Sequence, residues 1–174
     1  LWTLLKQGFN GSPAVRKAIV VCPTSLVKNW AGEIEKWLKD GCPFVACAES
    51  SRSAVEYAID KFLHSSYFRV LIISYETFRI QVNRFLKKGD GCCDMLICDE
   101  AHRLKNSETA TTMSLASLPC RRRLQLTRTP MQNDLQEFFA MTDFTNPGVL
   151  GTPKEFRRRF EMPILVGREP DAAD

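Results

Sequence analysis

Short runs of consecutive apolar residues alternate along this chain with longer segments in which apolar residues recur every three or four positions. Unbroken apolar runs are typical of parallel strands that are covered on both faces. They predict strands at residues 18–22, 44–47, 70–73 and 95–98, and we expect a fifth strand at 123–127. Because the strands alternate with helical segments, the predicted fold class is α/β, a parallel sheet with right-handed crossovers.

The segments with helical spacing predict the helices that connect these strands. Helices are expected at residues 1–7, 55–63, 77–87 and 107–117. Another helix begins near Ser25, with an apolar stripe formed by Leu26, Trp30, Ile34, Trp37 and Leu38. Asp134 and Thr152 each precede a glutamate by three positions, which is the spacing of a capping box at a helix start. From Pro163 onward, the glycine, prolines and charges are typical of a frayed tail or a linker.

Composition narrows the class of protein. The 174 residues are 44% hydrophobic and 25% charged, ordinary values for a globular domain with a substantial core. The net charge of +4 permits contact with nucleic acid without requiring it. No apolar run reaches the ~20 residues of a membrane span. The seven cysteines form no CxxC pair, which argues against a zinc site and for free thiols in a reducing, intracellular compartment.

Two adjacent acids at the end of the fourth apolar run are the strongest candidates for chemistry. Asp99 and Glu100 follow residues 95–98 directly, and His102 comes two positions later. Ligands of open parallel sheets collect beyond the carboxyl ends of the strands. In that position Asp99 suits a magnesium ligand, and Glu100 suits the base that orients and deprotonates an attacking water. The alternative is an acidic loop after a buried strand, without a catalytic role.

Four sequence blocks in a fixed order carry a family resemblance. They are residues 19–30 (IVVCPTSLVKNW), 73–78 (ISYETF), 99–106 (DEAHRLKN) and 126–135 (LTRTPMQNDL). Together they resemble the first RecA-like lobe of the Swi/Snf-type ATPases of helicase superfamily two. The resemblance covers residues 1–165, and residues 166–174 are interpreted as a tail or a linker. The run 151–165 is most similar to the recombination-repair branch, whose translocase assists the strand-exchange recombinase.

The resemblance implies a motor that hydrolyses ATP with Mg²⁺ and moves along double-stranded DNA without separating its strands. Asp99 would hold magnesium through water, and Glu100 would activate the attacking water. Nucleotide state would be coupled to DNA contact by His102, Thr127, Arg128, Thr129, Gln132 and Asn133. Phosphates of the tracked strand would be contacted by Thr24, Ser25, Lys28, Asn29, Tyr75 and Thr77. The implied partners are double-stranded DNA and either the strand-exchange recombinase or nucleosomes, in the nucleus and away from any membrane.

Several of these side chains have a structural alternative. Trp30 lies on an apolar helical stripe, where a core position is favoured over a platform for base stacking. Lys28 and Asn29 fit a solvated surface as well as a DNA contact. His102 fits a structural histidine as well as a coupling residue, although its place directly after two acids favours coupling.

The chain departs from the family pattern at the phosphate-binding loop. Nothing in it matches Gly-x-x-x-x-Gly-Lys-Ser/Thr. Where the family has this loop, just before a helix resembling residues 1–7, the chain has already begun, and we expect it to be a segment of a larger protein. A first lobe without the loop lysine, and without the second lobe that supplies an arginine finger, loses most of its binding to the β- and γ-phosphates. We therefore expect the chain by itself neither to bind ATP tightly nor to hydrolyse it.

Arg128 is a second departure, because the family pattern has glycine between the two threonines. At a positive φ, arginine would cost roughly 1–2 kcal/mol on steric grounds. Its guanidinium would also be able to form a salt bridge with Asp99 or Glu100 that inactivates the lobe. Impaired coupling, a tolerated natural variant and a sequencing error are equally open explanations.

Three functions remain open from the sequence. The first is the motor lobe of a DNA-stimulated ATPase. The second is a degenerate lobe retained as a non-catalytic DNA- or protein-binding module, which the missing loop and Arg128 favour. The third is an RNA helicase of the DEAH group. It is the weakest of the three, because residues 103–106 and the block at 23–30 fit the DNA translocases better.

Overall fold

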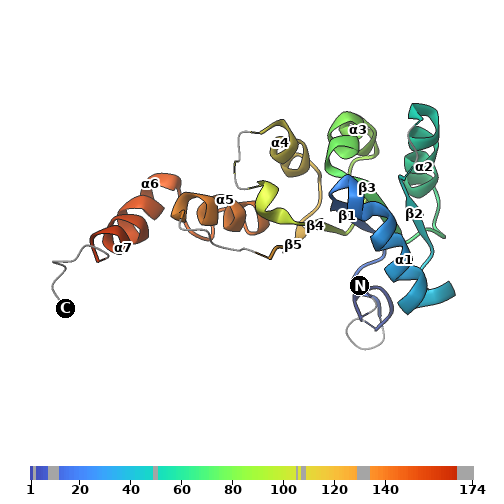
Figure 1. Cartoon of the computed structure of the whole chain (residues 1–174), viewed down its shortest axis with the longest axis horizontal. Coiled ribbons are helices and arrows are strands. Elements are labelled where there is room, and N and C mark those ends of the chain that lie inside the picture. The colour runs from blue at the N-terminus through green and yellow to red at the C-terminus, as the bar shows by residue number, and fades with distance from the viewer. Residues whose placement is uncertain are drawn as a thin grey trace.

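The computed structural model describes residue 1 and residues 3–7, 12–48, 51–104, 106, 109–128 and 134–167. Within this part of the chain a five-stranded sheet has the order β2-β3-β1-β4-β5, and every neighbouring pair is parallel (Figure 1). The strands are β1 (Ala18–Cys22), β2 (Phe44–Ala46), β3 (Val70–Ser74), β4 (Met95–Asp99) and β5 (Arg122–Leu126). The predicted parallel α/β fold is confirmed, and each strand end lies within one residue of its prediction.

Helices connect the strands and continue beyond the last one. They are α1 (Val27–Leu38), α2 (Arg52–His64), α3 (Tyr75–Lys88), α4 (Ala110–Ala116), α5 (Leu135–Thr145), α6 (Pro153–Phe156) and α7 (Met162–Val166). Short 3₁₀ turns occupy Thr24–Leu26, Lys39–Gly41 and Ala101–Leu104, and π-helical turns occupy Thr3–Gln7 and Arg157–Glu161. None of the helices in the described part of the chain is long and apolar enough to cross a membrane.

Successive residues of the central strands point to opposite faces of the sheet and enter two separate apolar cores. Val21 of β1 and Leu96 of β4 belong to the core that the sheet forms with α2, α3 and α4. Val20 and Ile97 belong to the core on the other face, with α1 and the N-terminal turn (Figure 1). β1 and β3 are buried at every position, as their unbroken apolar sequences predict. β5 is different, because it forms the edge of the sheet and its residues alternate between half-buried and exposed.

Two sequence predictions outside the sheet are wrong. Trp37 was expected on the buried stripe of its helix but is 69% exposed. It lies at the margin of that stripe, where its indole Nε1 donates to Glu33 Oε2 (2.6 Å) and the Lys36 ammonium lies 5.0 Å from its ring centroid. Residues 163–166 are helical rather than a frayed tail, because α7 continues directly from the helical turns at Pro153–Phe156 and Arg157–Glu161.

Polar side chains begin the helices as the capping pattern predicts. Thr152 forms a complete capping box with Glu155, and Pro153 takes the first helical position of α6. Asp134 accepts hydrogen bonds from the backbone N–H groups of Gln136 and Glu137 at the start of α5. These caps fix where α5 and α6 begin; α5 packs beside β5, and α6 lies farther from the sheet (Figure 1).

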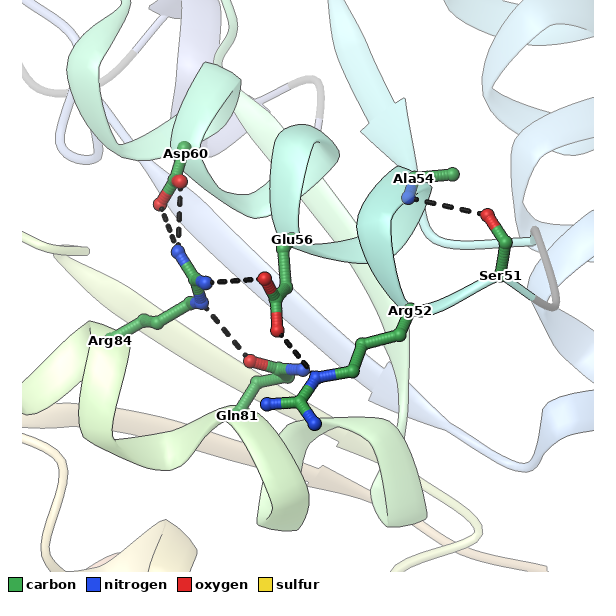
Figure 2. A network of polar contacts seen from close by, with 7 residues as sticks. All are labelled: Ser51, Arg52, Ala54, Glu56, Asp60, Gln81 and Arg84. Atoms are coloured by element: carbon green, nitrogen blue, oxygen red, sulfur yellow. Dashed lines mark hydrogen bonds and ion pairs between the residues drawn. The ribbon is translucent and has the colours of Figure 1, made fainter.

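A polar network joins α2 to α3 on the outer surface of the molecule. Figure 2 shows the Arg84 guanidinium of α3 between two carboxylates of α2. Its Nη1 donates to both oxygens of Asp60 (2.8 and 3.0 Å), and its Nη2 pairs with Glu56 (2.7 Å). Its Nε donates to Gln81 Oε1 (3.1 Å), and Arg52 pairs with Glu56 from within α2 (2.8 Å). Arg84 is therefore the residue that links the two helices.

We predict that Arg84→Ala destabilises the chain and that Arg52→Ala barely does. Arg84 holds two helices together through several charge-assisted hydrogen bonds, so its loss should lower the free energy of unfolding by about 1 kcal/mol. The Arg52 side chain is 87% exposed and pairs only within its own helix. Urea unfolding followed by circular dichroism measures both changes. Equal effects of the two substitutions would contradict this account of the network.

Candidate active site

The sequence blocks that carry the family resemblance meet at the carboxyl edge of the sheet. β1 ends at Cys22, in register with Ser74 of β3. β4 pairs with β1 on one side and with β5 on the other, and its last residue, Asp99, is in register with Leu126. Because all these strands are parallel, the residues that follow each of them lie along one edge, where ligands of open α/β sheets bind.

The Asp99 carboxylate is held by two neutral donors. Trp30 Nε1 of α1 donates to Asp99 Oδ2 (2.8 Å), and the backbone N–H of Glu100 donates to Oδ1 (2.9 Å). The hydroxyl of Tyr75 donates to the Asp99 backbone oxygen (2.8 Å). These three bonds fix the orientation of Asp99. Their donors come from the first two sequence blocks (Trp30 and Tyr75) and from the acid block itself (Glu100).

Trp30 and Tyr75 have roles here that sequence reasoning did not find. Trp30 packs against the core, as its helical stripe predicts, but its indole N–H also reaches Asp99. Tyr75 is 2% exposed, and burial raises the pKa of its hydroxyl, which remains a donor to the strand end. An apolar stripe predicts only the packing of an indole, because the direction of its N–H depends on a strand distant in the sequence.

Glu100 has a left-handed backbone conformation, with φ of 52°. Left-handed conformations are costly for residues with a β-carbon and cluster at functional sites. The Glu100 side chain is three-quarters buried, and its Oε2 lies 3.3 Å from His102 Nδ1. The two atoms are at ion-pair distance, yet His102 Nδ1 has no hydrogen-bond partner among the described residues. The strained turn thus brings the second acid of the pair against the histidine that follows it.

The charge on Asp99 fits a bound divalent cation. Within the described part of the chain no lysine or arginine forms an ion pair with this carboxylate, and its two donors are neutral. Carboxylate oxygens are the ligands that Mg²⁺ prefers. The thiol of Cys22 does not compete as a thiolate ligand, because burial and the Asp99 charge raise its pKa to about 12. The residues present therefore suit magnesium better than a soft metal.

The first group of predicted DNA-contacting residues is exposed at this edge. Thr24, Ser25, Lys28 and Asn29 lie in the 3₁₀ turn and the first turn of α1 and are all exposed. The Thr24 hydroxyl donates to Glu76 Oε2 (3.3 Å) across the gap between the turns that follow β1 and β3. These side chains lie on the same edge as Asp99, and their contact with DNA stays a prediction.

The second group of predicted DNA-contacting residues, Tyr75 and Thr77, is less exposed to solvent. Tyr75 is buried, as described above, so its side chain supports the end of β4. Thr77 is half-buried, and its hydroxyl and backbone N–H both bond to the Ser74 side chain, which caps α3 (2.9 and 3.1 Å). Contact of these two residues with phosphate stays a prediction, and the structure gives each of them a second, local role.

Arg128 causes neither the backbone strain nor the salt bridge that were considered from the sequence. Its φ is negative, because the positive values among described residues other than glycine occur at Lys39 and Glu100. Its side chain is exposed and forms no ion pair with Asp99 or Glu100. The strain and the inactivating salt bridge considered from the sequence are thus both absent.

The remaining residues of the predicted coupling block are described only in part. Thr127 follows β5 directly and is half-buried at the same edge as Asp99. Thr129, Gln132 and Asn133 lie outside the described residues. A coupling role for this block therefore stays a prediction.

Comparison with known proteins gives one consistent answer. The chain is 56% identical over 174 residues to the DNA repair and recombination protein RAD54 of Oryza sativa subsp. japonica, covering 99% of this chain and 18% of that protein. It is 56% identical to Protein CHROMATIN REMODELING 25 of Arabidopsis thaliana and 45% identical to the human DNA repair and recombination protein RAD54-like, covering all of this chain and 19% and 23% of those proteins. The chain thus spans about a fifth of the length of these relatives.

The fold comparison agrees. The solved SWI2/SNF2 ATPase core of Sulfolobus solfataricus in complex with double-stranded DNA superposes with a TM-score of 0.69 at 26% identity, covering 88% of this chain and 30% of that one. The five-stranded parallel sheet and its flanking helices match the RecA-like lobe of that core. The model of the SNF2-related domain matches residues 1–173. The chain therefore belongs to the SNF2-related domain family.

Proposed function

We propose that this chain is the first motor lobe of a DNA-dependent ATPase that translocates on double-stranded DNA in homologous-recombination repair or chromatin remodelling. The proposal rests on the geometry of the carboxyl edge and on the relatives, whose names refer to DNA repair, recombination and chromatin remodelling. A nuclear location and contact with a strand-exchange recombinase or nucleosomes belong to the same proposal. So does the division of the chain into a lobe at residues 1–165 and a tail or linker at 166–174.

The acid pair provides the chemistry of this proposal. Asp99 would hold Mg²⁺ through water, with Trp30 and the Glu100 N–H keeping its carboxylate in one orientation. Magnesium, when bound with ATP, neutralises charge on the transferred phosphoryl group. Glu100 would accept the proton of the attacking water, and His102, 3.3 Å away, would sense whether that carboxylate is engaged.

The observation that carries the proposal is the hydrogen bond from Trp30 Nε1 to Asp99 Oδ2 (2.8 Å). Trp30 follows Lys28 by two positions and Asn29 by one. All three residues lie on α1, whose first turn would contact DNA phosphates. The bond joins this helix directly to the residue that would hold the metal. Exposed hydroxyl, amide and ammonium groups contact phosphates without reading sequence, which is what a translocase requires.

We predict that Glu100→Gln in the full-length protein that carries this chain lowers duplex-stimulated ATPase at least ~100-fold, because loss of a general base costs on this order. Binding of duplex DNA should persist. The matched control is Glu35→Gln, an exposed acid of α1, which should leave the rate unchanged. The 174-residue chain alone is expected to show no magnesium-dependent ATPase, because it contains no phosphate-binding loop.

The same experiment tests the second candidate function, a non-catalytic binding module, which the missing phosphate loop within these 174 residues favours. That function requires the full-length protein to bind duplex DNA or a partner protein and to show no DNA-stimulated ATPase. Such a result, with the phosphate loop intact upstream, would contradict the motor proposal.

We predict that Trp30→Phe in the full-length protein raises the magnesium concentration required for half-maximal ATPase several-fold. Phenylalanine keeps much of the packing but removes the N–H that orients Asp99, and an unpaired carboxylate oxygen should also cost about 1 kcal/mol of stability. Trp37→Phe is the control, because the Trp37 N–H bonds to exposed Glu33 rather than to the site. A loss of stability in Trp30→Phe without any change in magnesium dependence would assign Trp30 a structural role only.

Lys28→Gln should weaken duplex binding of the full-length protein at every sequence tested. Removing one phosphate contact should reduce the slope of log affinity against log salt concentration by about 0.9. Lys36→Gln, near the other end of α1, removes the same charge and should leave the slope unchanged. Titrations of a labelled duplex at several salt concentrations measure both, and identical slopes for the two variants would remove Lys28 from the proposed DNA surface.

A further inference from the structure

Two cysteines face each other at the amino edge of the sheet, the edge opposite the acid pair. Met95 of β4 is in register with Arg122 of β5. Cys93 and Cys120 each stand two residues before these partners, so they occupy equivalent positions where two neighbouring parallel strands begin. Neighbouring strands lie roughly 4.8 Å apart, within the roughly 4.4–6.8 Å between α-carbons that a disulfide spans. The register therefore places these two residues near each other, just before the first paired residues of neighbouring strands.

The contacts of the thiols agree with the register. Cys92, Cys93 and Cys120 pack in one apolar core, and the neighbouring Cys120 and Cys92 thiols, together with burial, raise the pKa of Cys93. The backbone around Cys93 is fixed, because the next residue, Asp94, accepts hydrogen bonds from the N–H groups of Arg16 and Lys17 (2.7 and 2.9 Å). None of the seven cysteines forms a disulfide in this structure.

Cys92, Cys93 and Cys120 are all buried, and of these three Cys120 borders a pocket. Cys120 lines this pocket of about 440 Å³ together with Pro119, Arg121, Arg123 and Pro147. Cys93 does not line this pocket. The neighbouring Cys93 thiol, with smaller contributions from the Arg122 backbone and the Arg123 guanidinium, lowers the pKa of Cys120. In its protonated form the Cys120 thiol donates to the Arg122 backbone oxygen (3.4 Å).

We propose that Cys120 and Cys93 form an oxidisable dithiol, in which Cys120 reacts with hydrogen peroxide and Cys93 resolves the product. The Cys120 sulfur attacks one peroxide oxygen, the O–O bond breaks, and a sulfenic acid and one water form. The Cys93 sulfur then attacks the Cys120 sulfur, and the sulfenic oxygen leaves as a second water. Two thiols and one peroxide thus give one disulfide and two waters, with both sulfurs oxidised and the peroxide reduced.

The other cysteines provide an internal contrast. Burial raises the pKa of Cys47 and of Cys98 to about 12, which keeps both as unreactive thiols. Neither of them lines the pocket that Cys120 borders. Selective reaction at Cys120 is therefore the distinguishing feature of the proposed site.

The test is oxidation of the 174-residue chain by dilute hydrogen peroxide, followed by alkylation of free thiols, trypsin digestion without reductant and mass spectrometry. We expect the loss of two hydrogens from the chain and a link between peptides 89–103 and 106–121. Fragment ions between Cys92 and Cys93 should place the link at Cys93. This assignment uses the unsubstituted chain and therefore does not depend on whether a variant folds.

Two variants sharpen the result. Cys93→Ser should abolish the link and leave Cys120 as a sulfenic acid that dimedone captures, whereas Cys92→Ser, its neighbour, should retain the link. Circular dichroism confirms that each variant is folded. A link at Cys92 or Cys98, oxidation of Cys120 to sulfinic acid without a disulfide in the unsubstituted chain, or oxidation of Cys47 as fast as Cys120 would each overturn the proposal.

Discussion

The pairing of β4 between β1 and β5 is the constraint on which the rest of this structure depends. β4 is hydrogen-bonded to a parallel neighbour on each side, and its middle residues are buried on both faces. A slip of one residue would move every side chain to the opposite face and exchange the two apolar cores. The register therefore fixes which residue comes last on the strand, and that residue is Asp99.

The acid pair and the dithiol occupy opposite ends of this one strand. Cys93 precedes β4 and Asp99 ends it, so about 20 Å of extended chain separates them. At the amino edge the thiols pack in an apolar core, and the backbone N–H groups of Arg16 and Lys17 bond to Asp94. The carboxyl edge contains a half-buried carboxylate with neutral donors, which suits a cation. A parallel sheet keeps the two chemistries apart because all of its strands run in the same direction.

The backbone strain of the candidate active site lies in the turn that follows β4. Glu100 has a left-handed backbone, which costs roughly 1–2 kcal/mol for a residue with a β-carbon. The bond from its N–H to Asp99 Oδ1 offsets part of this cost and aligns the pair. Arg128, where the SNF2-related pattern has glycine, has a negative φ and adds no such strain. The departure from the family pattern is therefore tolerated by the backbone, while the strain occurs at the proposed base.

The sequence by itself determined the strands, the parallel α/β fold and the edge at which Asp99 and Glu100 lie, because apolar runs are local and their alternation with helical segments predicts parallel strands. It also identified the family, through the order of its four blocks. The tertiary structure alone decided the contacts between segments far apart in the chain. The bond of Trp30 to Asp99, the burial of Tyr75, the exposure of Trp37 and the facing of Cys93 with Cys120 each depend on how two elements pack. Periodicity shows which side of a helix or strand is apolar, but only the packed fold determines which distant side chain that side meets.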